Sequence, residues 1–138
     1  MTVARSSAVP VTATQLTAVA AGGAVGAVAR WGLTDAVPDG AGFPWTTFAI
    51  NVLGAGLLAL LPAIAERRHP LLALVLGPGV LGGFTTFSLY AEQARALVAD
   101  GSVLLAAAYA VGTLLACLLA VHGATALVRR RNEPDVLS

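Results

Sequence analysis

The polar residues that could take part in chemistry lie inside segments that are otherwise apolar. Asn51 is the only carboxamide of its segment, and Thr47, one turn earlier, shares its helix face. The stretch FTTFSLY (84–90) places hydroxyl groups beside Phe87 and Tyr90, which are three residues apart and share another helix face. A carboxamide offers two N–H donors, and the edge of an aromatic ring carries partial positive charge. Such groups can replace water around a small anion, so an anion site is one interpretation of the pattern.

Each of these residues also has a plainer interpretation. A buried Asn51 can hold two helices together, and Phe87 and Tyr90 can face lipid or the protein core. The hydroxyl groups of the stretch can bond back to their own helix. A last polar stripe, formed by Tyr109, Thr113 and Cys117 at steps of four, is a modest signal. Spacing alone leaves both interpretations open.

No pattern in the sequence indicates an enzyme. Nucleophile–base pairs and metal-ligand clusters are absent, and the single cysteine excludes an intrachain disulfide. The glycines from Gly77 to Gly82 match GxGxxG, but no predicted strand precedes them, so a dinucleotide site is rejected.

The composition predicts an all-α membrane protein. Hydrophobic residues make up 57% of the 138 residues and charged residues 11%, against about 45–50% and about 25% in soluble domains. Four apolar segments, at about residues 16–37, 45–65, 71–98 and 102–128, each reach the roughly 20 residues that cross a bilayer as a helix. We therefore expect a disordered lead-in (1–15), a four-helix transmembrane domain (16–128) and a basic, polar tail (129–138).

Charges and small residues predict how these helices are arranged. Short connections make neighbouring helices antiparallel. Arg5, Arg67, Arg68 and Arg129 to Arg131 then share the side of the two termini, whereas Arg30 and Arg95 lie on the other side. The positive-inside rule places the termini in the cytoplasm of a multi-pass protein of the cell (plasma or inner) membrane. Four helices make a thin bundle, so we expect an oligomer, with Gly22-xxx-Gly26 and Gly79-xxx-Gly83 as faces for close helix packing.

The third apolar segment is predicted to be broken mid-membrane. Its 28 residues would reach about 42 Å as a straight helix, and it contains Gly77-Pro78-Gly79 and Gly82-Gly83. A break exposes carbonyl oxygens that can coordinate a cation and amide donors that favour an anion. The alternative is a Gly/Pro kink that aids packing.

Three motifs together resemble the Fluc/CrcB family of fluoride channels: GGAVGAVARW (22–31), TTFAINVLGAG (46–56) and GPGVLGGFTTFS (77–88). The likeness covers roughly residues 16–128. It implies passive export of cytoplasmic fluoride, which reduces its toxicity, through an antiparallel dual-topology dimer with two pores. It also implies a structural Na⁺ at the dimer centre.

The resemblance carries roles over to particular positions. The carbonyl groups of Gly82 and Thr85 would hold the Na⁺, and Arg30 would lie at a vestibule or interface. The implied pore-lining residues are Asn51, Phe87, Tyr90, Thr47, Thr86, Ser88, Tyr109 and Thr113. Tyr90 stands where a second phenylalanine is usual. The arginine bias of six to two suggests that the dimer partner is an oppositely biased paralogous subunit, and a second copy of the chain is the alternative.

Two other functions compete with a fluoride channel. A small four-helix proton-coupled exporter of the multidrug type depends on a carboxylate in its first helix, and residues 16–34 contain none. A structural membrane protein without transport would leave Asn51, Thr85 and Phe87 without a purpose.

Overall fold

The computed structural model describes residues 11–63 and 69–132, and within these ranges every regular element is helical. In chain order the elements are α1 (Ala13–Ala36), α2 (Trp45–Leu61), α3 (Pro70–Leu74), the π-helical η2 (Val75–Leu81), α4 (Gly82–Phe84), α5 (Phe87–Ala99) and α6 (Val103–Asn132). The predicted all-α class is confirmed.

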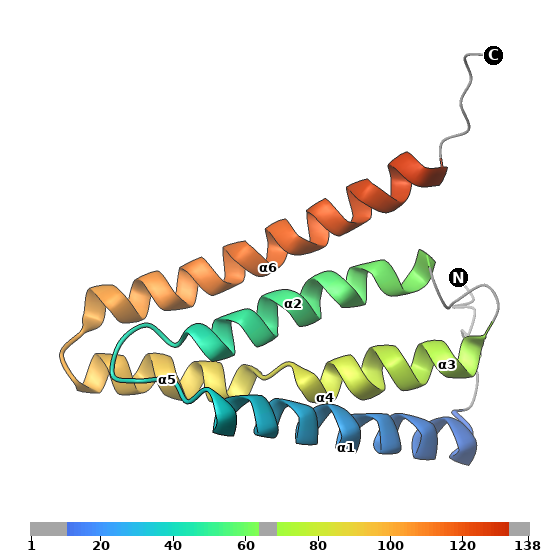
Figure 1. Ribbon diagram of the computed structural model, residues 1–138, viewed down its shortest axis with the longest axis horizontal. Helices are drawn as coiled ribbons and strands as arrows, with labels where there is room; N and C mark the ends of the chain where they lie inside the picture. Colours follow the sequence, from blue (N-terminus) through green and yellow to red (C-terminus); the bar gives the residue numbers. More distant parts are fainter. Residues whose placement is uncertain (1–10, 64–68, 133–138) are drawn as a thin grey trace, which may run out of the picture.

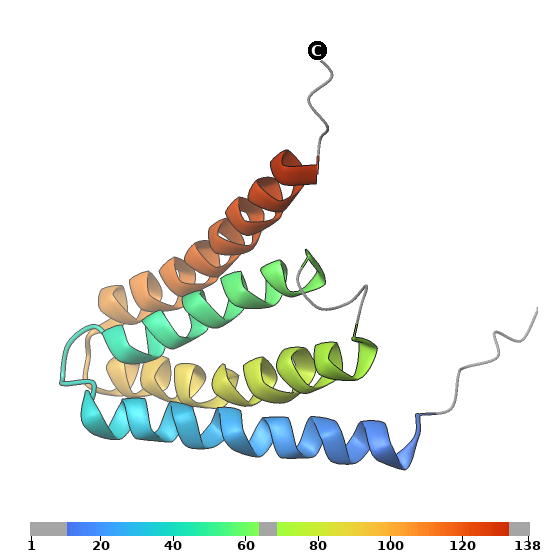
Figure 2. The same cartoon turned by 45° about the vertical axis from the view of Figure 1, so that its right-hand side comes forward.

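The helices form an antiparallel bundle in which each long segment reverses the direction of the one before it (Figure 1). The segment from α3 to α5 continues roughly along one line, and α1 packs along its first half, against η2 and α4. The last helix, α6, packs on α5 and α2 and then diverges from the bundle (Figure 2). The chain is therefore closely packed on the α1 side and more open on the α6 side.

Three of the helical segments are long and apolar enough to cross a membrane: Ala13–Ala36, Pro70–Ala99 and Val103–Arg130. The fourth, α2, is apolar but has only 17 residues, about 26 Å of helix, which is slightly less than the hydrocarbon thickness. The structure thus supports a membrane protein, and the fourth span stays a prediction.

Local signals explain where the first helix begins. The Thr12 hydroxyl accepts from the Gln15 N–H (3.2 Å), and the Gln15 side chain accepts from the Thr12 N–H (2.9 Å). This capping box satisfies two N–H groups that a helix start leaves unpaired. As a result α1 begins at Ala13, inside the predicted lead-in of residues 1–15, whose residues 1–10 lie outside the described ranges. At the other end, α6 continues past residue 128 into the predicted tail.

Glycines allow α1 to approach the third segment closely. A Cβ atom on Gly22 would lie 2.5 Å from the Val75 carbonyl oxygen, and one on Gly26 would overlap the Val80 carbonyl oxygen. On the third segment, which faces α1, a Cβ atom on Gly83 would overlap the backbone of Gly23. The predicted small-residue faces are confirmed, and they pack against each other within one chain.

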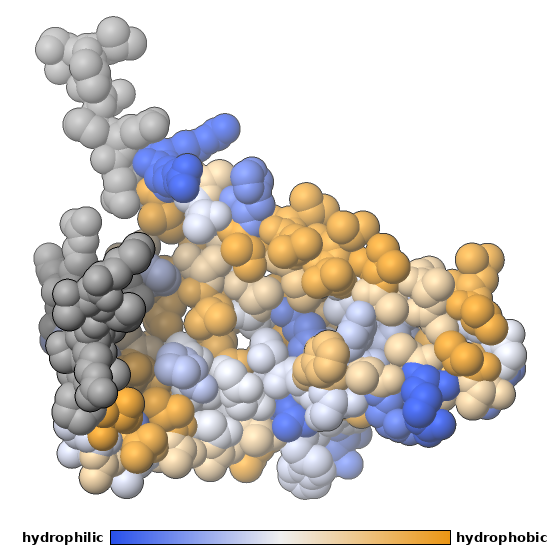
Figure 3. All heavy atoms as spheres, turned by 180° about the vertical axis from the view of Figure 1, so that it is seen from behind, coloured by the Kyte–Doolittle hydropathy of each residue, from blue (hydrophilic) through white to orange (hydrophobic). Residues whose placement is uncertain are grey.

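The buried core is small for a chain of this length. Among the described residues, its hydrophobic members are Ile50, Leu97, Ala106 and Tyr109. Large apolar side chains are instead exposed, including Leu104 (84% exposed) and Leu119 (71% exposed) on α6. Figure 3 shows hydrophobic side chains spread over this part of the surface. Such a surface requires lipid or another protein chain to cover it.

Candidate functional site

The third segment is interrupted at Thr85 and Thr86. Both residues have extended backbone angles (φ −74°, ψ 157° and φ −146°, ψ 120°), between α4, which ends at Phe84, and α5, which begins at Phe87. The Thr86 hydroxyl accepts from the Leu89 N–H (3.2 Å) and caps the new helix. The predicted interruption is confirmed, although Pro78 does not cause it. Pro78 lies inside the continuous π-helical turn of η2, whose wider winding accommodates a residue without an N–H group.

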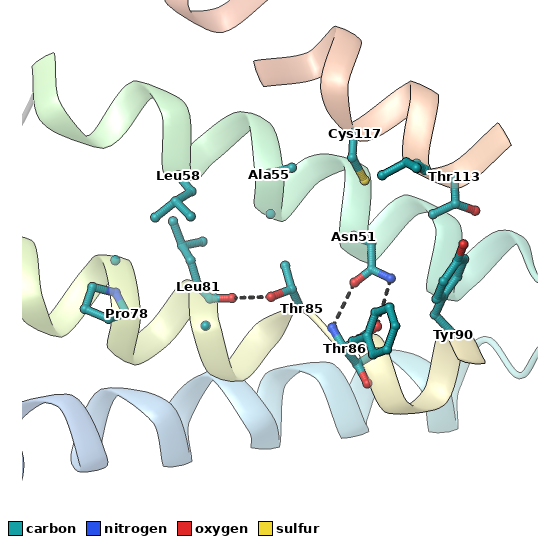
Figure 4. Close-up of a pocket in the computed structure, with 15 residues that line it drawn as sticks. Asn51, Ala55, Leu58, Pro78, Leu81, Thr85, Thr86, Tyr90, Thr113 and Cys117 are labelled. Atoms are coloured by element: carbon teal, nitrogen blue, oxygen red, sulfur yellow. Dashed lines mark hydrogen bonds between the residues drawn. The ribbon is translucent and has the colours of Figure 1, made fainter. Parts of the chain in front are cut away.

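Asn51 holds the interruption in place. Its Nδ2 donates to the Thr86 carbonyl oxygen (3.0 Å), and its Oδ1 accepts from the Thr86 N–H (2.8 Å), as Figure 4 shows. Both backbone groups of the extended residue are thus satisfied by one side chain from α2. Because a carboxamide has two N–H donors, Asn51 keeps one donor beyond those described bonds. The two interpretations of Asn51 are therefore compatible, since it can connect helices and still offer a donor.

A cavity of about 620 Å³ lies beside the hydrogen-bonded pair Asn51–Thr86, between α2, the third segment and α6. The structure brings seven of the predicted site residues to its wall: Asn51, Gly82, Thr85, Thr86, Phe87, Tyr90 and Thr113. Thr113 and Cys117 approach from α6, opposite the interruption (Figure 4). The Thr113 hydroxyl is buried and has no hydrogen-bond partner within the described residues. A buried polar atom without a partner calls for a ligand, a water molecule or another chain.

The two aromatic residues of the cavity behave differently. Phe87 is 80% exposed, so its ring lies at the open side of the cavity. Tyr90 is partly buried and donates its hydroxyl proton to the Ala110 carbonyl oxygen (2.7 Å). The ring centroids are 5.8 Å apart. The Tyr90 hydroxyl therefore fastens α5 to α6, and it is the ring that borders the cavity.

Four predicted residues do not line this cavity. Thr47 is fully buried and donates to Asp39 Oδ2 (3.0 Å), and Tyr109, also fully buried, donates to Gln93 Oε1 (2.9 Å). Ser88 is exposed, with its hydroxyl 3.4 Å from that of Thr86. Arg30 donates from Nε to the Gly83 carbonyl oxygen (3.3 Å) and so ties α1 to α4. The pore roles of the first three residues, and the vestibule role of Arg30, stay predictions.

Thr47 and Tyr109 belong to a second polar cluster, and the sequence analysis did not single out the residue at its centre, Asp39. Asp39, in the loop between α1 and α2, accepts from the N–H groups of Thr46 (2.7 Å) and Thr47 (3.2 Å) at the start of α2, and from Gln93 Nε2 (3.1 Å) on α5. The position of this acidic residue shortly before the start of α2 could have indicated that it binds the free N–H groups of that helix. The link to Gln93, 54 residues away, has no local signature.

The surroundings of Asp39 stabilise its ionised form. Partial burial pushes the pKa of the carboxyl group upward, but hydrogen bonds from Thr46, Thr47 and Gln93 outweigh that effect and lower the pKa below its ordinary value. The carboxylate is therefore charged at neutral pH and acts only as an acceptor.

The residues predicted to hold a cation offer suitable oxygen atoms. Neither the Gly82 nor the Thr85 carbonyl oxygen accepts any of the loop, cap or side-chain hydrogen bonds of the described residues, whereas the Thr85 N–H and hydroxyl both donate to the Leu81 carbonyl. Carbonyl groups at an interrupted helix suit a hard cation. No cluster of three acidic, histidine or cysteine side chains provides an alternative metal site within residues 11–63 and 69–132.

Comparison with known proteins agrees with this arrangement. Residues 17–125 match the family model described as CrcB-like protein, Camphor Resistance (CrcB). A protein of Mycobacterium bovis named Fluoride-specific ion channel FluC 1 is 46% identical over 120 residues, covering 84% of this chain and 91% of that protein. Fluoride-specific ion channel FluC 2 of Thermobifida fusca is 50% identical over 124 residues, with the same two coverages.

A third relative, Fluoride-specific ion channel FluC of Novosphingobium aromaticivorans, is 45% identical over 104 residues, covering 71% of this chain and 82% of that protein. The family match spans the interruption, the cavity and most of each long helix. The chain belongs to the CrcB family.

Proposed function

We propose that this protein is a fluoride-selective channel that lets cytoplasmic fluoride leave the cell passively, and that it is not an enzyme. The observation that carries the proposal is the cavity beside the interrupted helix, whose wall includes Asn51, the exposed ring of Phe87 and Thr113. The names of the relatives, all fluoride-specific ion channels, support it.

The chemistry of the cavity fits a small, strongly hydrated anion. Removing water from such an ion is costly unless hydrogen-bond donors take its place, and conduction also requires that the ion can leave again. The spare N–H of Asn51 and the hydroxyl of Thr113 are donors of modest strength, and the edge of the Phe87 ring adds partial positive charge. A full cation in the wall would bind fluoride more tightly and slow its release.

The pore is completed by a second chain in this proposal. The cavity of one chain is open on one side, and Phe87 at that side is 80% exposed. A second chain in antiparallel orientation would cover this ring and form two pores with residues of both chains. The partner is either a second copy or a paralogous subunit, and the existence of relatives numbered FluC 1 and FluC 2 is in line with the second option.

The interrupted helix would also hold a structural Na⁺ between the two chains. The carbonyl oxygens of Gly82 and Thr85 supply ligands from one chain, and the same pair from its partner would double that number. The cation stabilises the dimer and takes no part in carrying fluoride. The protein would cross the inner membrane four times, with α2 as its shortest span.

Fluoride efflux from loaded liposomes tests the channel function. Vesicles that contain the purified chain should release fluoride, measured with an electrode, and should retain chloride. Release only in the presence of a proton gradient would support the multidrug-type exporter instead, although residues 16–34 of α1 contain no carboxylate. Vesicles as tight as bare lipid, although they contain the dimer, would support the structural protein. Phe87→Leu should slow fluoride release strongly without preventing assembly.

A further inference from the structure

The polar cluster around Asp39 joins the loop before α2 to α2, α5 and α6. It consists of Asp39, Thr46, Thr47, Gln93 and Tyr109. Thr47 and Tyr109 are fully buried. The Tyr109 ring lies edge-on to Phe43 (5.3 Å between centroids) and 5.2 Å from the Tyr90 ring. The cluster therefore touches the cavity through Tyr90, an aromatic residue of its wall.

The carboxylate sets the direction of the hydrogen bonds between side chains in the cluster. An ionised carboxylate can only accept, so the Gln93 side chain must turn its Nε2 toward Asp39. Its Oε1 then faces Tyr109, and because this oxygen can only accept, the Tyr109 hydroxyl must donate. A phenol has a single proton. An anion that reached the Tyr109 oxygen would meet lone pairs and not a donor.

We propose that Asp39 is a positioning residue for conduction, which acts through Gln93 to keep the Tyr109 hydroxyl proton away from the anion and to hold the Tyr109 ring against Tyr90. Tyr109 then has a different role from the pore-lining one expected from the sequence, since its hydroxyl is engaged and only its ring supports the wall. The inference rests on the proposed channel function, because fluoride efflux is its readout.

A double-mutant cycle tests the direction of the bonds. Asp39→Asn replaces an acceptor by a group that also donates, so the Gln93 amide loses its fixed orientation. Efflux should fall by about tenfold, which corresponds to about 1.4 kcal/mol in the barrier. Gln93→Glu alone places two carboxylates in contact and should also slow efflux. The double variant restores one carboxylate and one carboxamide: position 39 donates to position 93, which still accepts from Tyr109, but the amide nitrogen at position 39 cannot accept from the Thr47 N–H. Its efflux should therefore exceed that of either single variant and stay below wild type.

Two controls separate this role from general damage. Asp100→Asn removes a carboxylate from the exposed turn before α6 and should leave efflux unchanged. The unfolding midpoint and the elution volume of each variant in detergent show whether it folds and assembles. Wild-type efflux in the same experiment tests the channel function itself, so its loss is distinguishable from failure of this inference.

The cycle gives clear outcomes. Efflux in the double variant above that of both single variants supports the proposal, because two side chains in contact are then shown to act through their shared hydrogen bond. Efflux that only follows the unfolding midpoint of each variant would mark the role as structural and overturn the proposal. Unchanged efflux in folded Asp39→Asn, or a double variant slower than both single variants, would overturn it. If Asp39→Asn does not fold, the proposal is tested with the double variant alone. A double variant that conducts supports the proposal, and a double variant that also fails to fold overturns it.

Discussion

The chain contains two polar regions that treat hydrogen bonds in opposite ways. In the cluster around Asp39, the carboxylate accepts from four donors, and the Thr47 and Tyr109 hydroxyl protons are both engaged. In the cavity beside the interruption, Asn51 keeps a donor and the buried Thr113 hydroxyl has no partner among the described residues. Engaged groups stabilise a fold, whereas groups with spare capacity can bind a ligand. The contrast separates a supporting region from a conducting one.

The largest effect is expected where one residue serves both purposes. Asn51→Ala leaves the Thr86 N–H and carbonyl without partners and removes the spare donor, so fluoride efflux should fall by more than about a hundredfold, or about 2.7 kcal/mol in the barrier. Asn51→Asp is the matched variant, because it still accepts from the Thr86 N–H but sets a second acceptor against the Thr86 carbonyl oxygen and adds a negative charge. It should conduct as poorly as Asn51→Ala. Normal efflux in either variant would remove Asn51 from the pore.

A pair of identical substitutions compares the two regions directly. Thr→Val keeps the shape of the side chain and removes its hydroxyl. Thr47→Val leaves Asp39 with one donor fewer and should lower the free energy of unfolding by about 1–3 kcal/mol. Thr113→Val removes a buried hydroxyl without a described partner and should leave stability unchanged or raise it, while it slows efflux about tenfold.

Unfolding by denaturant and efflux of the same two preparations check this pair. The comparison fails if Thr113→Val unfolds as easily as Thr47→Val, since its hydroxyl would then be engaged within the fold.

Tyr90→Phe should have a small effect on transport. The Tyr90 hydroxyl donates to the Ala110 carbonyl oxygen, so its loss should cost about 0.5–1.5 kcal/mol of stability, and the ring still borders the cavity. Efflux and the preference for fluoride over chloride should stay close to wild type. A large loss of fluoride efflux in a stable protein would show that the hydroxyl contacts the ion.

The sequence predicted the helices and the interruption because their signals are local. Apolar segment lengths and the four-residue spacings Gly22–Gly26 and Gly79–Gly83 can be read within a few residues. The capping pair Thr12–Gln15 is equally local, but these residues were assigned to the lead-in, so the start of α1 was predicted too late. The location of the interruption was harder to predict. Gly77 and Pro78 carry the stronger local signal, but the extended residues are Thr85 and Thr86. The backbone of Thr86 is held by Asn51, 35 residues away.

Contacts between residues far apart in the sequence also limited the prediction of the candidate site. The structure brings seven of the predicted residues to one cavity, but their grouping across different helices came from the family resemblance, and their pore role stays a prediction. Thr47 and Tyr109 were predicted to line the pore with Asn51, but in one chain each donates its proton to a partner that is not its sequence neighbour, Asp39 and Gln93. Such pairings depend on tertiary packing, which one sequence does not display.

The smallest expected effect concerns the stability of the engaged region in acid. The Asp39 pKa is lower in the fold than its ordinary value of 3.8. Ionised Asp39 therefore contributes stability that is fully present above about pH 4 and is lost as the pH falls through the pKa of Asp39 in the folded protein. The unfolding midpoint of the wild type in detergent should fall as the pH decreases below about 4. Part of this fall comes from the other carboxylates, and the control variant Asp100→Asn, which keeps Asp39, should show almost the same fall as the wild type. Asp39→Asn should be less stable at neutral pH and lose less on acidification, because it has no proton to take up at this position. Equal acid sensitivity of the wild type and Asp39→Asn would show that the carboxylate does not stabilise the cluster, and the contrast between the two regions would then rest on Thr113 alone.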